Sequence, residues 1–101
     1  MYARITTFDG AGPERLDEAI DTNSREIDGA LQSLPEGLEG VKEVWMLVDR
    51  ESGKTVDITL FGSEEELQRG HEALNAMSPS DAEGSRASVG LYEVAFRKER
   101  S

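Results

Sequence analysis

The sequence predicts a single α+β domain of ferredoxin-like βαββαβ order, in which a four-stranded antiparallel sheet carries both helices on one face. The chain has 101 residues, which is the size of one domain. Hydrophobic periodicity divides it into strand-like and helical segments in the order β-α-β-β-α-β. With right-handed crossovers, this order puts the two helices on the same side of the sheet. We expect one domain over residues 1–101, with an ordered core at about 2–97.

The first strand and the first helix are marked by their residue types. Residues 2–8 are rich in β-branched and aromatic side chains and stop at a glycine-containing turn, as strands do. Pro13 follows at the first helical position, with acidic residues in the first turns, and both features favour a helix N-terminus. Apolar residues then recur at helical spacing as far as Leu34, with one gap at Asn23.

The middle of the chain reads as a hairpin. Residues 40–50 are apolar with little alternation, which is typical of a strand covered on both faces. Residues 55–61 are strand-like again, and the short polar loop between the two segments predicts an antiparallel pair.

The second helix begins with a capping box, because Glu66 follows Ser63 at the required spacing. We expect this helix to end near Ser78 and the last strand to cover residues 88–96.

The apolar pattern of the last strand indicates a second copy. Val89 and Leu91 share one face of this strand, whereas Tyr92 and Phe96 share the other. Because the segment 40–50 is also apolar on both faces, a monomer would expose a large apolar patch, which monomers rarely do. We therefore expect a homodimer formed through the sheet face.

Charge and composition exclude several classes of partner. The chain has 11 basic and 21 acidic residues, a net charge of −10, which repels phosphate backbones and anionic lipid. We therefore expect neither nucleic-acid binding nor binding to a membrane surface. No apolar run approaches the ~20 residues of a membrane span, so we also expect no membrane-spanning segment. With no Cys, disulfides and Cys-ligated zinc are excluded. No basic leader precedes the first strand, so a cytoplasmic location is expected.

Two polar residues stand on helix faces that are otherwise apolar. His71 shares a stripe with Leu67 and Leu74, so it either acts as a base or ligand or sits at the core edge, hydrogen-bonded to backbone. Asn23 fills the gap in the first helix. Its amide either meets a ligand in a pocket between helix and sheet, or reaches the rim through a slight roll of the helix.

Asp57 places a carboxylate between apolar strand residues. Burial without a partner would raise its pKa and make it a proton acceptor. We favour the alternative, an ion pair with Arg4, because the first and third strands are neighbours in this topology and buried charges are usually paired.

The aromatic residues Trp45, Phe61 and Tyr92 either line a ligand pocket or, as we favour, belong to the core and the dimer interface. The acidic residues of the first helix fall on its solvated face. No phosphate-binding glycine loop, nucleophile elbow or metal-binding histidine pair is present, so no cofactor and no metal are expected.

Four segments together resemble the antibiotic-biosynthesis-monooxygenase-like (ABM) domains of the dimeric α/β-barrel superfamily. They are Ala3-Arg4-Ile5-Thr6-Thr7-Phe8, Leu47-Val48-Asp49-Arg50-Glu51-Ser52-Gly53-Lys54, Ile58-Thr59-Leu60-Phe61-Gly62-Ser63-Glu64-Glu65 and Tyr92-Glu93-Val94-Ala95-Phe96. The resemblance covers the chain from about Tyr2 to Arg97. It implies that two protomers pack sheet on sheet and that each has a pocket between its sheet and its helices.

The chain also departs from the family pattern. Where the family often has Trp before Ser-Glu-Glu, this chain has Phe61, and Asp57 stands where the quinone-forming oxygenases have Asn. The haem-degrading members use an Asn on the first strand, a Trp on the third and a His late in the second helix. Because the first and third strands lack these residues and His71 lies early in its helix, haem degradation is disfavoured.

Two functions remain open. The departures favour a non-catalytic small-ligand-binding or scaffold protein. The alternative implied by the resemblance is a cofactor-independent monooxygenase acting on a small aromatic or polyketide-like substrate. In that enzyme Asp57 or His71 would accept a proton, while Asn23 and Phe61 would position the ring. Further candidate contacts to a small apolar or aromatic ligand are Trp45, Tyr92 and Arg4.

Overall fold

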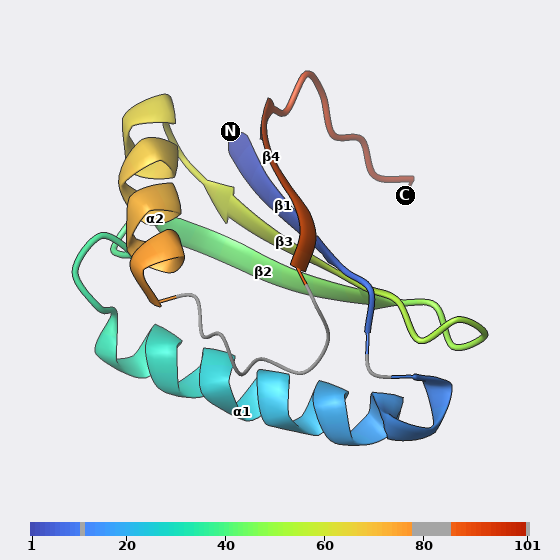
Figure 1. Cartoon of the computed structure of the whole chain (residues 1–101). Helices are drawn as coiled ribbons and strands as arrows, with labels where there is room; N and C mark the ends of the chain where they lie inside the picture. The colour runs from blue at the N-terminus through green and yellow to red at the C-terminus, as the bar shows by residue number, and fades with distance from the viewer. Residues whose placement is uncertain (11, 78–85, 101) are drawn as a thin grey trace.

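A computed structural model describes residues 1–10, 12–77 and 86–100 and has the predicted order of elements (Figure 1). The strands are β1 (Tyr2–Phe8), β2 (Val41–Val48), β3 (Thr55–Phe61) and β4 (Arg86–Glu93), and the helices are α1 (Leu16–Ser33) and α2 (Glu64–Met77). The strands form one antiparallel sheet of order β2-β3-β1-β4. This arrangement confirms the ferredoxin-like fold.

Most element boundaries follow local chemistry. The predicted cap by Ser63 at the start of α2 is confirmed, since its hydroxyl accepts the backbone N–H of Glu66 and donates to the Glu66 carboxylate at 3.1 Å. The helical segment at Pro13 opens instead with a short 3₁₀ turn, η1 (Pro13–Arg15), because Gly12 offers no side chain to cap an α-helix.

The predicted ends of the last strand and of the second helix can now be set beside the observed ones. The last strand covers Arg86–Glu93, two residues earlier at its start and three residues earlier at its end than the predicted 88–96. Ser78, where we predicted the end of the second helix, lies outside the described residues.

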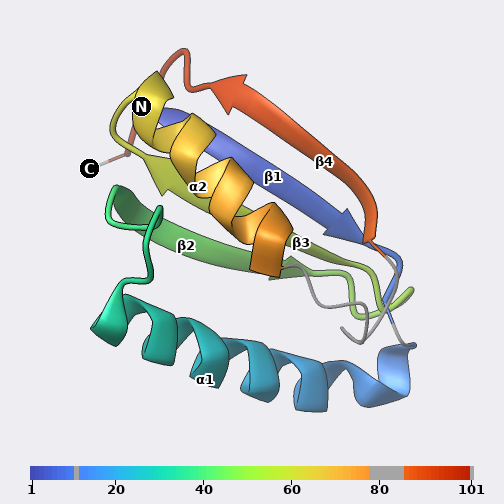
Figure 2. The same cartoon turned by 60° about the vertical axis from the view of Figure 1, so that its left-hand side comes forward.

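Both helices lie on one side of the sheet, α2 over β1 and β3 and α1 along the β2 side (Figures 1 and 2). In the described part of the chain, neither helix is long and apolar enough to cross a membrane. Phe61 is fully buried beneath α2, where it packs against Gly70, which has no side chain in the way. The apolar residues of the core are Ala3, Leu16, Leu38, Leu60, Phe61 and Leu67.

Strand alternation divides the side chains between a helix side and an open side. Arg4 pairs with Thr59 and Thr6 pairs with Asp57, so these side chains lie on the same face of the sheet as Phe61. This face is the helix side, because Phe61 is buried under α2. The other face, the open side, carries Trp45 and Leu47, which are 44% and 47% exposed in the single chain.

The exposure of Trp45 and Leu47 is what the sequence analysis expects of a single protomer, in which the helices cover only one side of the sheet.

Candidate functional site

A cluster of polar side chains lies on the helix side, between the sheet and the two helices. Its members come from separate parts of the chain: Arg4 and Thr6 on β1, Asp57 on β3, Asn23 on α1, and His71 and Asn75 on α2. We call this group the helix-side cluster.

Arg4 forms the centre of the cluster and is only 7% exposed. Its guanidinium donates hydrogen bonds to Thr6 Oγ1 at 2.9 Å, to His71 Nδ1 at 3.2 Å and to Asn75 Oδ1 at 3.3 Å. Because a guanidinium only donates, His71 Nδ1 is the acceptor of the bond from Arg4. The other ring nitrogen, Nε2, lies 3.2 Å from the Asn75 amide nitrogen.

Asn23 reaches inward from α1. Its Nδ2 donates to Met46 Sδ at 3.2 Å and to Asp57 Oδ1 at a longer 3.5 Å. Of the two sequence interpretations, the structure thus has the amide aimed at the sheet, with partners supplied by β2 and β3. Asn23 is half-buried.

Burial raises the pKa of the half-buried Asp57 carboxyl above its ordinary value. The hydrogen bond from Asn23 and, to a smaller extent, the positive charge of Arg4 lower the pKa, but they do not cancel the effect of burial. The carboxyl is therefore a better proton acceptor than an exposed aspartate.

The predicted Arg4–Asp57 ion pair is wrong in its geometry. The register places Thr6 opposite Asp57, so Arg4 is a diagonal neighbour two residues away. The guanidinium turns instead toward His71 and Asn75 on α2. Arg4 acts on Asp57 through its charge, whereas the carboxylate takes its hydrogen bond from Asn23.

The structure brings Arg4, Asn23, Asp57 and His71 together but separates the three aromatic candidates from them. Trp45 and Tyr92 pair with Ile58 and Ala3, which puts both aromatic residues on the open side. Phe61 shares the parity of Asp57, as its spacing predicted, yet it is fully buried against Gly70 and belongs to the core.

Sequence reasoning missed Thr6 and Asn75. The periods of a strand and of a helix would have predicted both residues. Thr6 is two residues from Arg4 and so shares its strand face, and Asn75 is four residues from His71 and so shares its helix face. Within the described residues, no three His, Asp or Glu side chains gather to hold a metal ion.

The chain is thus a ferredoxin-like α+β protomer with polar side chains between its sheet and its helices. Among solved structures, the chain is similar to a monooxygenase from the gene ActVA-Orf6 of Streptomyces coelicolor, determined in complex with nanaomycin D. The match has a TM-score of 0.66 and 14% identity, and it covers 99% of this chain and 92% of the other.

A conserved protein from Methanosarcina mazei Go1 is similar at a TM-score of 0.55 and 14% identity, over 90% of this chain and 89% of that one. No family model and no curated protein matches the sequence. At this identity the likeness concerns the fold, and it confirms at that level the resemblance noted in the sequence.

Proposed function

We propose that this chain is a homodimeric small-ligand-binding protein whose ligand binds at the helix-side cluster. One observation carries the proposal: four separate elements contribute polar side chains to the space between sheet and helices, where the fold by itself requires only apolar packing. The similar Streptomyces protein, which was solved with nanaomycin D, supports a ligand on this fold.

The chemistry of the cluster selects the class of ligand. Arg4 and Asn23 supply hydrogen-bond donors for a phenol or carbonyl oxygen, and Asp57 supplies an acceptor for a hydroxyl proton. Half-buried Met46 and buried Leu16 are apolar residues on the neighbouring β2 and α1. A small aromatic compound with ring oxygens fits both kinds of surface.

The raised pKa of Asp57 favours a second candidate function, a cofactor-independent monooxygenase. In such a reaction a phenol would give its proton to Asp57, and the electron-rich ring would then react with O₂. Conversion of a ring C–H to a carbonyl balances as phenol + O₂ → quinone + H₂O. One oxygen atom enters the ring, and the other leaves as water.

The binding proposal is tested by amide and side-chain NMR shifts on titration with nanaomycin D and with 1-naphthol. We expect shifts at Asn23, Asp57 and His71. Asp57→Asn and Asn23→Ala should each weaken binding roughly tenfold, since a lost hydrogen bond to a charged or buried group is worth about 1.5 kcal/mol. Arg25→Gln is the matched control, because Arg25 is exposed on α1 and forms an ion pair with exposed Asp21, away from the cluster. Shifts confined to the open side would overturn the proposal.

Catalysis is tested separately with 1-naphthol in air and under argon, with no cofactor added. A monooxygenase would form a quinone only in air, and Asp57→Asn would abolish the product without preventing the fold. Binding without product would leave the ligand-binding function and exclude the monooxygenase for this substrate.

The homodimer is proposed from the exposure of the open side. Trp45, Leu47 and Tyr92 are 44%, 47% and 55% exposed, which is a large apolar area for one small protomer. Sedimentation equilibrium at micromolar concentration should give twice the chain mass of 11.1 kDa. A single species at the chain mass would contradict the dimer.

A further inference from the structure

The Arg4 side chain turns away from a carboxylate that lies within its reach. Asp57 is its diagonal neighbour across β1 and β3, a separation of about 7–8 Å that a long side chain can span. The positive charge of Arg4 already acts on Asp57 at this range. The guanidinium nevertheless donates to His71 and Asn75 on α2. The direction of the Arg4 side chain therefore has a cause outside the sheet.

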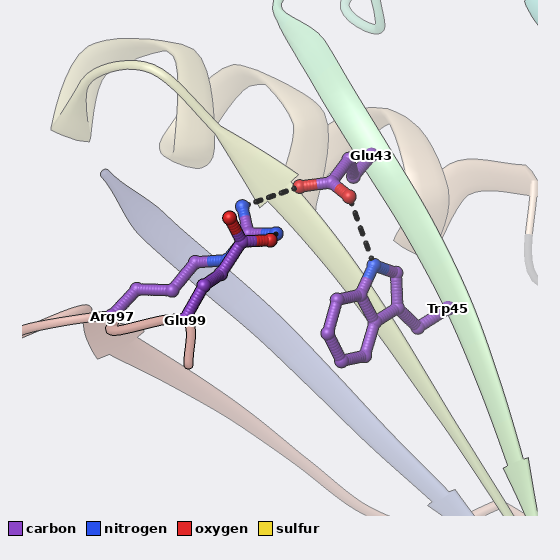
Figure 3. Close-up of polar contacts among 4 residues, drawn as sticks. All are labelled: Glu43, Trp45, Arg97 and Glu99. Atoms are coloured by element: carbon purple, nitrogen blue, oxygen red, sulfur yellow. Dashed lines mark hydrogen bonds and ion pairs between the residues drawn. The ribbon is translucent and has the colours of Figure 1, made fainter. Parts of the chain in front are cut away.

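Other arginine residues of this chain pair with a nearby carboxylate. Arg97, in the segment after β4, places its Nη1 3.2 Å from Glu43 Oε2 on β2 (Figure 3). Further pairs are Arg25–Asp21, Arg50–Asp17 and Arg69–Glu39. Water and salt screen such exposed pairs, whereas the attraction between buried Arg4 and half-buried Asp57 is screened less. A direct Arg4–Asp57 pair is therefore the expected arrangement unless another group holds the guanidinium.

His71 is the group on α2 that holds it. Nε is the first nitrogen of the guanidinium along the side chain, so its bond to His71 Nδ1 at 3.2 Å fixes the direction in which the rest of the group points. Asn75 accepts from Nη2 at 3.3 Å, but Asn75 is exposed, and water can replace a hydrogen bond there. His71 is half-buried. Loss of the bond to His71 would therefore change the direction of Arg4 most.

We propose that His71 is a positioning residue of the ligand site: its Nδ1 keeps the Arg4 guanidinium on α2 and so leaves the Asp57 carboxylate open to a hydroxyl group of the ligand. The inference rests on the proposed ligand-binding function and gives His71 a part in it that is neither base nor ligand contact. A carboxylate accepts several hydrogen bonds, so a ligand hydroxyl can bind Asp57 beside the long bond of 3.5 Å from Asn23. A guanidinium paired with Asp57 would occupy the same oxygens.

The electrostatics of Asp57 agree with this arrangement. Its pKa is raised because burial outweighs the hydrogen bond from Asn23 and the distant charge of Arg4. An opposite charge in direct contact lowers the pKa of a carboxyl group. The pKa of Asp57 therefore reports where the guanidinium lies, whether or not a ligand is bound.

The test is the pKa of Asp57, followed through the carbon-13 shift of its carboxyl group in a pH titration of the full chain. His71→Leu removes the acceptor, so Arg4 should pair with Asp57 and bring the pKa of Asp57 from above its ordinary value to below it. His71→Ala should do the same with a side chain too small to disturb the packing. His71→Asn should keep the pKa raised, because its amide oxygen can accept in place of Nδ1.

Two further variants show whether Arg4 is the cation responsible. Arg4→Met/His71→Leu should restore the raised pKa of Asp57, since no guanidinium is left to pair with it. Arg69→Gln is the matched control on α2, because it removes a cation that pairs with exposed Glu39 and should leave the pKa of Asp57 unchanged.

Ligand binding is measured on the same variants with 1-naphthol as the probe. The affinity should fall roughly tenfold in His71→Leu, because the hydroxyl of the probe then competes with Arg4 for the carboxylate, and it should recover in His71→Asn.

The outcomes separate this inference from the function on which it rests. A pKa of Asp57 that stays above its ordinary value in both His71→Leu and His71→Ala would overturn the positioning role, whatever the affinity for 1-naphthol. An equal fall of the pKa in His71→Asn would also overturn it, because an acceptor at residue 71 would then not be what holds Arg4. A wild-type chain that binds neither 1-naphthol nor nanaomycin D would overturn the proposed function itself.

Discussion

Replacement of Gly70 by alanine tests the packing that places α2 on the sheet. A Cβ on Gly70 would approach the Phe61 ring far more closely than the 3.0 Å that real Cβ atoms keep. Phe61 is fully buried. The same change at Gly29, in the interior of α1, meets no atom within 4 Å. The two glycines therefore differ in packing but share a helical backbone.

The expected free energies follow from two opposed effects. Alanine gains about 1 kcal/mol over glycine in a helix interior, because it loses less backbone freedom on folding. Overpacking a buried contact costs about 1–3 kcal/mol. Gly29→Ala should therefore stabilise the protein by about 0.5–1 kcal/mol, whereas Gly70→Ala should destabilise it by up to about 2 kcal/mol.

The assay is urea unfolding followed by far-ultraviolet circular dichroism, with all proteins at the same concentration because a dimer makes stability concentration-dependent. The double variant Gly70→Ala/Phe61→Leu should recover part of the loss, since the smaller side chain makes room for the new methyl group. If Gly70→Ala stabilised the chain as much as Gly29→Ala, the close approach of Phe61 to α2 would be refuted.

Three further predictions concern the cluster and the α2 cap. The raised pKa of Asp57 means that the folded state holds the proton more tightly than the unfolded chain, so wild-type stability falls as pH rises from about 4 through the folded pKa. Asp57→Asn should thus equal or exceed the wild type in thermal stability at pH 7 and lose that advantage below about pH 4; a lower melting temperature at pH 7 would contradict this. Arg4→Met should cost about 2 kcal/mol in urea unfolding, because buried Thr6 and half-buried His71 lose their donor, and a change under about 0.5 kcal/mol would argue against the network. Ser63→Ala should cost about 1 kcal/mol through loss of the cap, with Ser24→Ala at an exposed position of α1 as control; equal effects would show that the cap contributes nothing specific.

The sequence by itself determined the elements and their order. The β-branched residues of 2–8 and 55–61 give strands with the bounds observed, and Ser63 with Glu66 marks the start of α2. These features depend on neighbours within a few residues, where backbone sterics and local hydrogen bonds decide the structure. The parity of the strands was also readable, and it placed Asp57 and Phe61 on one face.

Only the tertiary structure decided which polar groups meet. From sequence, Arg4 had a carboxylate on the neighbouring strand as its obvious partner, yet its long side chain turns to His71 and Asn75 on α2. The Asp57 carboxyl is half-buried and accepts one hydrogen bond, from the Asn23 amide of α1. Burial therefore raises its pKa, whereas a direct ion pair would have lowered it. The sheet register and the placing of two helices fix these distances, and a difference of two residues along one strand is enough to exchange one partner for another. The same holds for Phe61, whose burial depends on a glycine that packing, not local sequence, brings above its ring.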